Sequence, residues 1–294
     1  MSDDNPRLGI ILVVTGLCIA AFTGALMKKL SVDLTAYQIT WFRYLGFVVI
    51  LFPIVAIRFG SRAFRPTRPW MQGVRGLTMA TGTVLFVLGA RTIDFADAIS
   101  ILYAYPFLLT LLAVLFLKEK VSGQGWVAVV GGFLGVLLVM RPEFGKVNVG
   151  SFFVLGSAVI VSVQMILNRK LGAISHPLVT SIWGGAIATL LLSVIVPFHW
   201  NPLSFDHALL LVLMAVCGAA NQVCLVYGFA IAEASTLAPF TYLEIVASVI
   251  FGFLVFGTLP LGISWIGIAL IIISGVVVAR SMKGNLVPRR NPRI

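Results

Sequence analysis

Long apolar runs separated by short polar breaks fill almost the whole of the 294-residue chain. A helix that crosses the hydrocarbon core of a bilayer needs about 20 mostly apolar residues. Runs of about that length predict helices at 8–27, 35–58, 70–90, 94–117, 122–140, 149–171, 177–198, 206–229, 233–257 and 260–280. The pattern therefore predicts an all-α polytopic membrane protein with ten transmembrane helices.

A transmembrane β-barrel is the alternative architecture, and the pattern argues against it. Barrel strands alternate polar and apolar residues over about ten positions, whereas Ile10–Ala21 and Ile268–Ala279 are apolar on all faces. The first apolar run follows Asp3 and Asp4 and has no clear small-residue cleavage site after it. We therefore interpret this run as a retained helix rather than a signal peptide.

Composition and charge give further evidence for a membrane protein and predict its orientation. Only 11% of the residues are charged and 60% are hydrophobic, whereas soluble domains carry about 25% charged residues. With a cytoplasmic N-terminus, 14 of the 21 Lys and Arg fall in cytoplasmic segments and 5 in segments on the other face. This bias predicts both termini in the cytoplasm and a multi-pass protein of a bacterial-type inner membrane. The net charge of +11 then orients helices and does not indicate nucleic acid as a partner.

The two halves of the chain resemble each other. Ala96-Asp97-Ala98 opens the fourth predicted helix, and Ala232-Glu233-Ala234 opens the ninth. Pro106 follows in the fourth helix and Pro239 in the ninth. Because proline lacks a backbone N–H, both residues must disturb their helices, and we predict that they act as hinges.

The likeness predicts a five-helix unit at 1–145 that is repeated at 146–294, where a basic C-terminal tail follows it. Because five is odd, the second copy would enter the membrane in the opposite direction. Inverted repeats of this kind are typical of secondary transporters, whose binding site lies near the membrane midplane between the repeats.

Three charged residues stand out inside the predicted helices, namely Arg43, Arg75 and Glu244. A charge at the bilayer centre costs about 2.5–3.5 kcal/mol on insertion scales. Glu244 is therefore a candidate proton-coupling or substrate-binding carboxylate, or alternatively the partner of a structural ion pair with either arginine. Arg43 is the better substrate contact, because Arg75 lies near the inner end, where its side chain can extend to the interface.

Aromatic and amide side chains join these charges around the two prolines, and a pocket there would suit a small polar molecule. The predicted substrate-binding residues are Gln38, Trp41, Arg43, Arg75, Tyr103, Tyr105, Trp183, Asn221, Gln222, Tyr242 and Glu244. The sequence contains no GxxxxGK[ST], HExxH or GxSxG motif, so it predicts no enzyme, cofactor or metal site. A channel and a lipid-acting membrane enzyme are the alternatives to a gradient-driven transporter.

The chain resembles the EamA-type branch of the drug/metabolite transporter superfamily over nearly its whole length. The matching segments are Lys28-Lys29-Leu30-Ser31, Gln38–Arg43, Arg75-Gly76-Leu77, Ala96-Asp97-Ala98, Pro106, Leu117-Lys118-Glu119 and Ala238–Ile245. Two departures are Phe256-Gly257-Thr258, where the family often has a second Gly-Glu, and Asn221-Gln222, where it often has a histidine.

The resemblance implies two inverted five-helix repeats and alternating access around a central cavity. It also implies a small polar organic substrate, such as an amino acid, a carboxylate or a heteroaromatic like riboflavin. Besides that substrate, the expected partners are membrane lipid and, as one alternative for the coupling ion, protons. The resemblance leaves open whether the protein is a monomer or a homodimer.

Overall fold

The computed structural model describes residues 5–60, 66–117, 121–140, 148–172, 174–232 and 234–281. Its elements are α1 (Pro6–Leu30), α2 (Ala36–Phe59), α3 (Pro69–Ala90), α4 (Phe95–Leu102), α5 (Tyr105–Leu117), α6 (Gly123–Met140), α7 (Val149–Gly172), α8 (Pro177–Ile195), η2 (Val196–His199), α9 (Phe205–Ile231), α10 (Ala234–Leu237), η3 (Ala238–Tyr242), α11 (Leu243–Phe256) and α12 (Gly262–Ser281). Lys118-Glu119-Lys120, Glu233 and the basic tail lie outside the described residues.

The prediction of an all-helical, multi-pass membrane protein is confirmed. Among the described residues there is no strand, and nine helices are long and apolar enough to cross a membrane. The tenth, α12, is apolar over the shorter stretch Gly262–Val278. The arrangement of these helices as two inverted repeats stays a prediction.

Two of the predicted helices are not continuous, and a proline accounts for each interruption. The predicted helix 94–117 divides into α4 and α5 at Tyr103 and Ala104, just before Pro106. The predicted helix 233–257 divides into α10, the 3₁₀ segment η3 around Pro239, and α11. Glu244 therefore lies in the first turn of α11 and not in the middle of a long helix. The partial positive charge at a helix N-terminus favours a carboxylate there.

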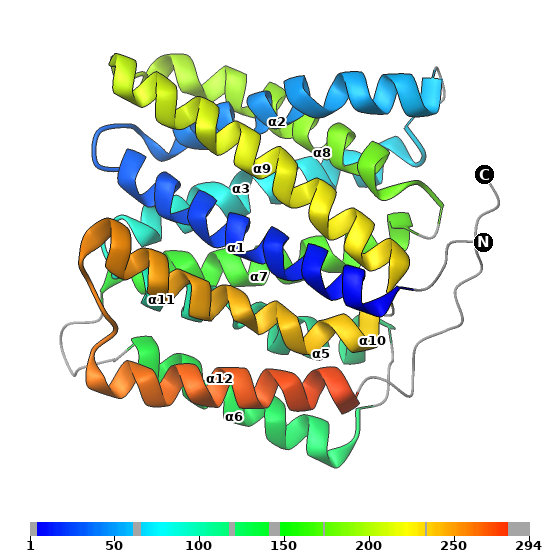
Figure 1. The fold of residues 1–294 in the computed structure, drawn as a ribbon, viewed down its shortest axis with the longest axis vertical. Helices are drawn as coiled ribbons and strands as arrows, with labels where there is room; N and C mark the ends of the chain where they lie inside the picture. The colour runs from blue at the N-terminus through cyan, green and yellow to red at the C-terminus, as the bar shows by residue number, and fades with distance from the viewer. Residues whose placement is uncertain are drawn as a thin grey trace.

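The helices lie side by side across the molecule, with α6 and α12 paired along one edge (Figure 1). We call the end of the bundle at which α1 begins and α12 ends the terminal end. The opposite end, which carries the loops 31–35 and 200–204, is the distal end. These two names describe the bundle alone and assign neither end to a side of the membrane.

Helix pairs between the two halves of the chain recur in matching positions. The contacts of α1 with α9 and α11 correspond to those of α7 with α3 and α5, if α7 is taken as the counterpart of α1. The contact of α2 with α9 likewise corresponds to that of α8 with α3. The pairs α2–α8 and α6–α12 are their own counterparts. This is the contact pattern that a two-fold relation between the halves would give.

One close crossing joins α6 to α12 through two glycines. A Cβ atom added at Gly135 would lie 2.8 Å from the carbonyl oxygen of Gly267, and one added at Gly267 would lie 2.7 Å from that of Gly135. Small residues allow transmembrane helices to approach closely and gain van der Waals contact. Gly131 and Gly135, which have the GxxxG spacing, therefore allow α6 to pack closely on α12 of the same chain.

We expect Gly135→Ala to lower the free energy of unfolding by about 1–3 kcal/mol, the usual cost of overpacking a tight contact. The matched control is Gly218→Ala in α9, because a Cβ there meets no atom within 4 Å. Thermal unfolding of the two variants in detergent, followed by gel filtration, checks the difference. Equal unfolding midpoints would contradict the close α6–α12 crossing.

Candidate functional site

A tyrosine of the first half of the chain holds the carboxylate of Glu244 in the second half. The Tyr103 hydroxyl lies 2.8 Å from Glu244 Oε2 and 2.6 Å from the backbone oxygen of Thr241, so it can donate to either. Tyr103 is only 2% exposed, and it follows directly after α4, where the helix is interrupted. The two interrupted helices therefore meet at this hydrogen bond, which orients the carboxylate.

Two more tyrosine rings pack near the ring of Tyr103. The rings of Tyr105 and Tyr242 lie 5.6 Å and 5.4 Å from the ring of Tyr103, and both are tilted against it. The Tyr242 ring covers Gly275 of α12, where an added Cβ would overlap with the ring atoms. The ring faces of tyrosines attract cations, so a carboxylate with three tyrosines around it is suited to a positively charged group.

The Arg43 guanidinium has only weak interaction partners among the described residues. Its Nη1 donates to the thioether sulfur of Met27 at 3.0 Å, and the guanidinium carbon lies 5.8 Å from the ring centre of Tyr44. A guanidinium carries five N–H donors, and a thioether is a weak acceptor. In the part of the chain that the structure describes, no carboxylate forms an ion pair with Arg43.

Glu244 lies near enough for the charge of Arg43 to act on it, but the two groups do not form an ion pair. We call Arg43, Tyr103, Tyr105, Tyr242 and Glu244 the central cluster. Buried charges are normally paired because an isolated charge in a low-dielectric interior is costly. A half-buried cation close to a half-buried carboxylate without a direct contact can therefore accept a ligand that carries both kinds of charge.

Arg75 lies elsewhere and donates hydrogen bonds to two acceptors of the protein. It is 5% exposed, and its Nε donates to Asn168 Oδ1 at 2.5 Å while its Nη1 donates to the Thr180 backbone oxygen at 2.7 Å. The expectation that its side chain extends to the interface is wrong, because these acceptors hold it between α3, α7 and α8. Its contacts are those of a residue that links helices.

Three other predicted site residues lie on α8 and α9. Gln222 Nε2 donates to Ser181 Oγ at 2.9 Å, which joins α9 to α8. Trp183 lines a small apolar pocket between α2 and α8 together with Phe52. Asn221 has a buried amide oxygen without a hydrogen-bond donor. Neither Asn221 nor Gln222 forms a hydrogen bond to the central cluster.

The remaining two predicted residues connect the halves at the distal end. Gln38 is completely buried; its Nε2 donates to the Asn201 backbone oxygen at 2.8 Å, and its Oε1 accepts from the Asn201 N–H at 3.0 Å. Trp41 Nε1 donates to Ser193 Oγ at 2.8 Å. Both side chains belong to the first two turns of α2, so they lie close to Arg43 along that helix.

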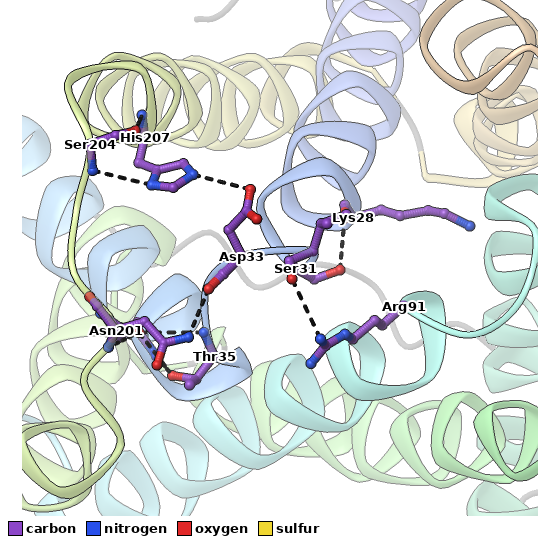
Figure 2. A network of polar contacts seen from close by, with 10 residues as sticks. Lys28, Ser31, Asp33, Thr35, Arg91, Asn201, Ser204 and His207 are labelled. Carbon is purple, nitrogen blue, oxygen red and sulfur yellow. Dashed lines mark hydrogen bonds and ion pairs between the residues drawn. The ribbon is translucent and has the colours of Figure 1, made fainter.

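Sequence reasoning missed several polar residues that take part in these contacts. Asp33, Asn201 and His207 form a hydrogen-bonded network at the distal end (Figure 2). The available signals were the helix-capping patterns Thr35…Gln38 and Ser204…His207, because such pairs mark helix starts and order the adjoining loops. Within the described residues, no group of three or more His, Cys, Asp and Glu could hold a metal ion.

Known proteins similar to this chain are transporters of small molecules. It is 27% identical over 249 residues to the S-adenosylmethionine uptake transporter of Rickettsia prowazekii, with 84% of each chain covered. It is 26% identical over 286 residues to the pseudopaline exporter CntI of Pseudomonas aeruginosa, with 96% of this chain and 99% of that protein covered. It is also 27% identical over 206 residues to the riboflavin transporter of Rhizobium johnstonii, with 67% and 66% covered.

The fold also has a counterpart among solved structures. One crystal structure superposes with a TM-score of 0.64 over 94% of this chain and 98% of the other, at 17% sequence identity. The model of the EamA-like transporter family matches twice, at residues 7–141 and 148–280. These two matches cover nearly the whole sequence, and the chain therefore belongs to the EamA-like transporter family.

Proposed function

We propose that this protein is a secondary active transporter for a small organic metabolite that carries both a carboxylate and a cationic group. The observation that carries the proposal is the central cluster, in which Arg43 and Glu244 lie near each other without an ion pair. A substrate with both charges would satisfy the two groups at once. Family membership and the transporters among the relatives support the general class.

The two ends of the site have different chemistry. Arg43 would bind the substrate carboxylate, because a guanidinium can donate two parallel hydrogen bonds to its two oxygens. Glu244 and the faces of Tyr103 and Tyr105 would hold the cation. S-adenosylmethionine, the substrate named for a relative, has a carboxylate, an ammonium and a sulfonium group and is a suitable first probe.

Glu244 would also be the site of proton coupling. A carboxylate that binds either a proton or a substrate cation makes the two compete, and such competition links the movement of one to the movement of the other. The Tyr103 hydroxyl keeps the carboxylate in place in the substrate-free protein. In this scheme a proton replaces the substrate during the return step.

Alternating access would follow from the arrangement of the helices. We place the units 1–145 and 146–294 in the membrane as inverted repeats, with both termini in the cytoplasm of a bacterial-type cell and the interruptions at Pro106 and Pro239 as hinges. The two family matches, the matching helix pairs and the distribution of Lys and Arg support this arrangement. The relatives include an uptake transporter and an exporter, so the proposal covers both directions.

Counterflow in proteoliposomes tests the proposed function. We expect accumulation of radiolabelled S-adenosylmethionine or an amino acid, driven by unlabelled compound inside, and no accumulation of the corresponding methyl ester. Riboflavin, which lacks both charges, is the matched negative probe. Transport of riboflavin without transport of any doubly charged compound would contradict the role of the charges, and unitary currents in a planar bilayer would indicate a channel.

A further inference from the structure

The two halves of the chain are connected at the distal end by a hydrogen-bonded network around Asn201. Its side-chain Nδ2 donates to the backbone oxygen of Asp33 at 2.7 Å (Figure 2). Its backbone N–H and oxygen bind the side-chain amide of Gln38. Asn201 follows η2 in the second half of the chain, and Asp33 and Gln38 belong to the loop after α1 and the start of α2. One residue thus ties the α8–α9 connection to two points of the first half.

A histidine and an aspartate add a second link beside it. His207 Nε2 lies 3.2 Å from Asp33 Oδ2. The backbone N–H of Ser204 donates to His207 Nδ1 at 3.2 Å, so Nδ1 is an acceptor and Nε2 carries the hydrogen that points to Asp33. Figure 2 shows this chain of contacts from Ser204 through the His207 ring to Asp33.

Further contacts between the halves surround these links. The Thr35 hydroxyl donates to the backbone oxygen of His199 at 3.0 Å, and the rings of Tyr37 and His199 lie 4.9 Å apart. Gln38 precedes Arg43 by five positions in α2, which is about 7.5 Å along the helix axis. The network therefore lies on the distal side of Arg43 along α2.

The chemistry of the network suits contacts that break and reform. Asp33 is 61% exposed at its side chain, and exposed ion pairs and hydrogen bonds gain little net free energy because water replaces them readily. At the terminal end the halves are also in contact, since Arg58 Nη1 donates to the Tyr227 hydroxyl at 2.6 Å. The halves are thus in contact at both ends of the bundle.

We infer that Asp33, Thr35, Gln38, Asn201 and His207 form a latch that closes the distal entrance to the central cluster. The inference rests on the proposed alternating access. When the latch opens, the α1–α2 loop and the α8–α9 loop separate, and water takes over the hydrogen bonds of Asn201 and Asp33. When it closes, Gln38 and Asn201 rejoin and seal the space above Arg43.

The distance between the two loops tests the latch without any transport assay. Spin labels at cysteines introduced by Val32→Cys and Leu203→Cys, in a background in which Cys18, Cys217 and Cys224 are replaced by alanine, report this distance by pulsed electron resonance. Asp33→Ala should raise the ratio of long to short distances about five-fold, the effect of losing an exposed charged contact. Gln38→Ala, which removes both bonds to Asn201, should raise it further.

Asp206→Ala is the matched control, because Asp206 adjoins His207 and carries the same charge as Asp33, whereas the ion pair of His207 is to Asp33. Its distance distribution should equal that of the parent. Unchanged distances in both Asp33→Ala and Gln38→Ala would overturn the latch.

Cross-linking provides the second readout. Cysteines introduced by Asp33→Cys and His207→Cys, joined by a short reducible bifunctional thiol reagent, should stop counterflow, and reduction should restore it. Counterflow at the full rate through fully cross-linked protein would overturn the latch while the transporter function stands. Absence of counterflow by the parent protein would count against the proposed function alone, because the distance measurement still decides whether the latch exists.

Discussion

Replacement of Arg43 by glutamine is expected to lower kcat/KM for the doubly charged substrate about 30-fold or more, since loss of one partner of a buried, hydrogen-bonded charge pair costs at least about 2 kcal/mol. The Arg43 guanidinium donates a hydrogen bond to a thioether and lies near a tyrosine ring, and among the described residues it forms no ion pair. The variant should therefore fold as well as the parent. Initial rates of uptake into proteoliposomes at several substrate concentrations check this expectation.

Arg43→Lys is the informative control for this result. It keeps the positive charge but cannot donate two parallel hydrogen bonds to one carboxylate, so its rate should fall between those of the parent and Arg43→Gln. An equal, full rate for both variants would contradict substrate binding by Arg43. A loss of folded protein on gel filtration would instead show that Arg43 stabilises the helix bundle.

The second large effect is expected at Glu244. Glu244→Gln removes the negative charge but still offers an oxygen to the Tyr103 hydroxyl, so the hydrogen bond between the interrupted helices should persist. We expect uptake of the cationic substrate to fall about 30-fold or more, on the same reasoning as for Arg43. The remaining uptake should no longer respond to an imposed proton gradient, which proteoliposomes with different internal and external pH would measure.

Tyr103→Phe distinguishes the effect of the charge of Glu244 from the effect of its orientation. This variant keeps the carboxylate and removes the hydroxyl that holds it, so we expect a loss of several-fold, with the response to the proton gradient retained. Full activity and an unchanged pH dependence in Glu244→Gln would remove Glu244 from both coupling and binding. A loss in Tyr103→Phe as large as that in Glu244→Gln would mean that orientation, not charge, is decisive.

The apolar runs of the sequence predict the helices well because the requirement to span a bilayer is local and depends on length and hydropathy. The interruptions near Pro106 and Pro239 were also predictable, since proline removes a backbone donor wherever it stands. The number of residues that depart from the α-helix around each proline was not predictable. The 3₁₀ segment that places Glu244 in the first turn of α11 depends on packing against neighbouring helices, which no local pattern reveals.

The roles of some polar residues were predictable from the sequence, and those of others depend on distant partners. Arg43 and Glu244 were identifiable because charges are rare inside transmembrane helices. The burial of Arg75 depends on Asn168 and Thr180, which lie far from it in the sequence. The partners of Gln38 likewise come from the other half of the chain. Spacing within one helix cannot tell a side chain that faces a cavity from one that binds another helix.

The central claim is that Arg43 binds the carboxylate of the substrate, and a comparison of two ligands on two proteins tests it most directly. The measurement is the dissociation constant of the transported compound and of its methyl ester, each with the parent protein and with Arg43→Gln. We expect the parent to bind the acid about 30-fold or more tightly than the ester, and Arg43→Gln to bind the two almost equally. If Arg43→Gln keeps the full preference for the acid, another residue binds the carboxylate and the claim is wrong.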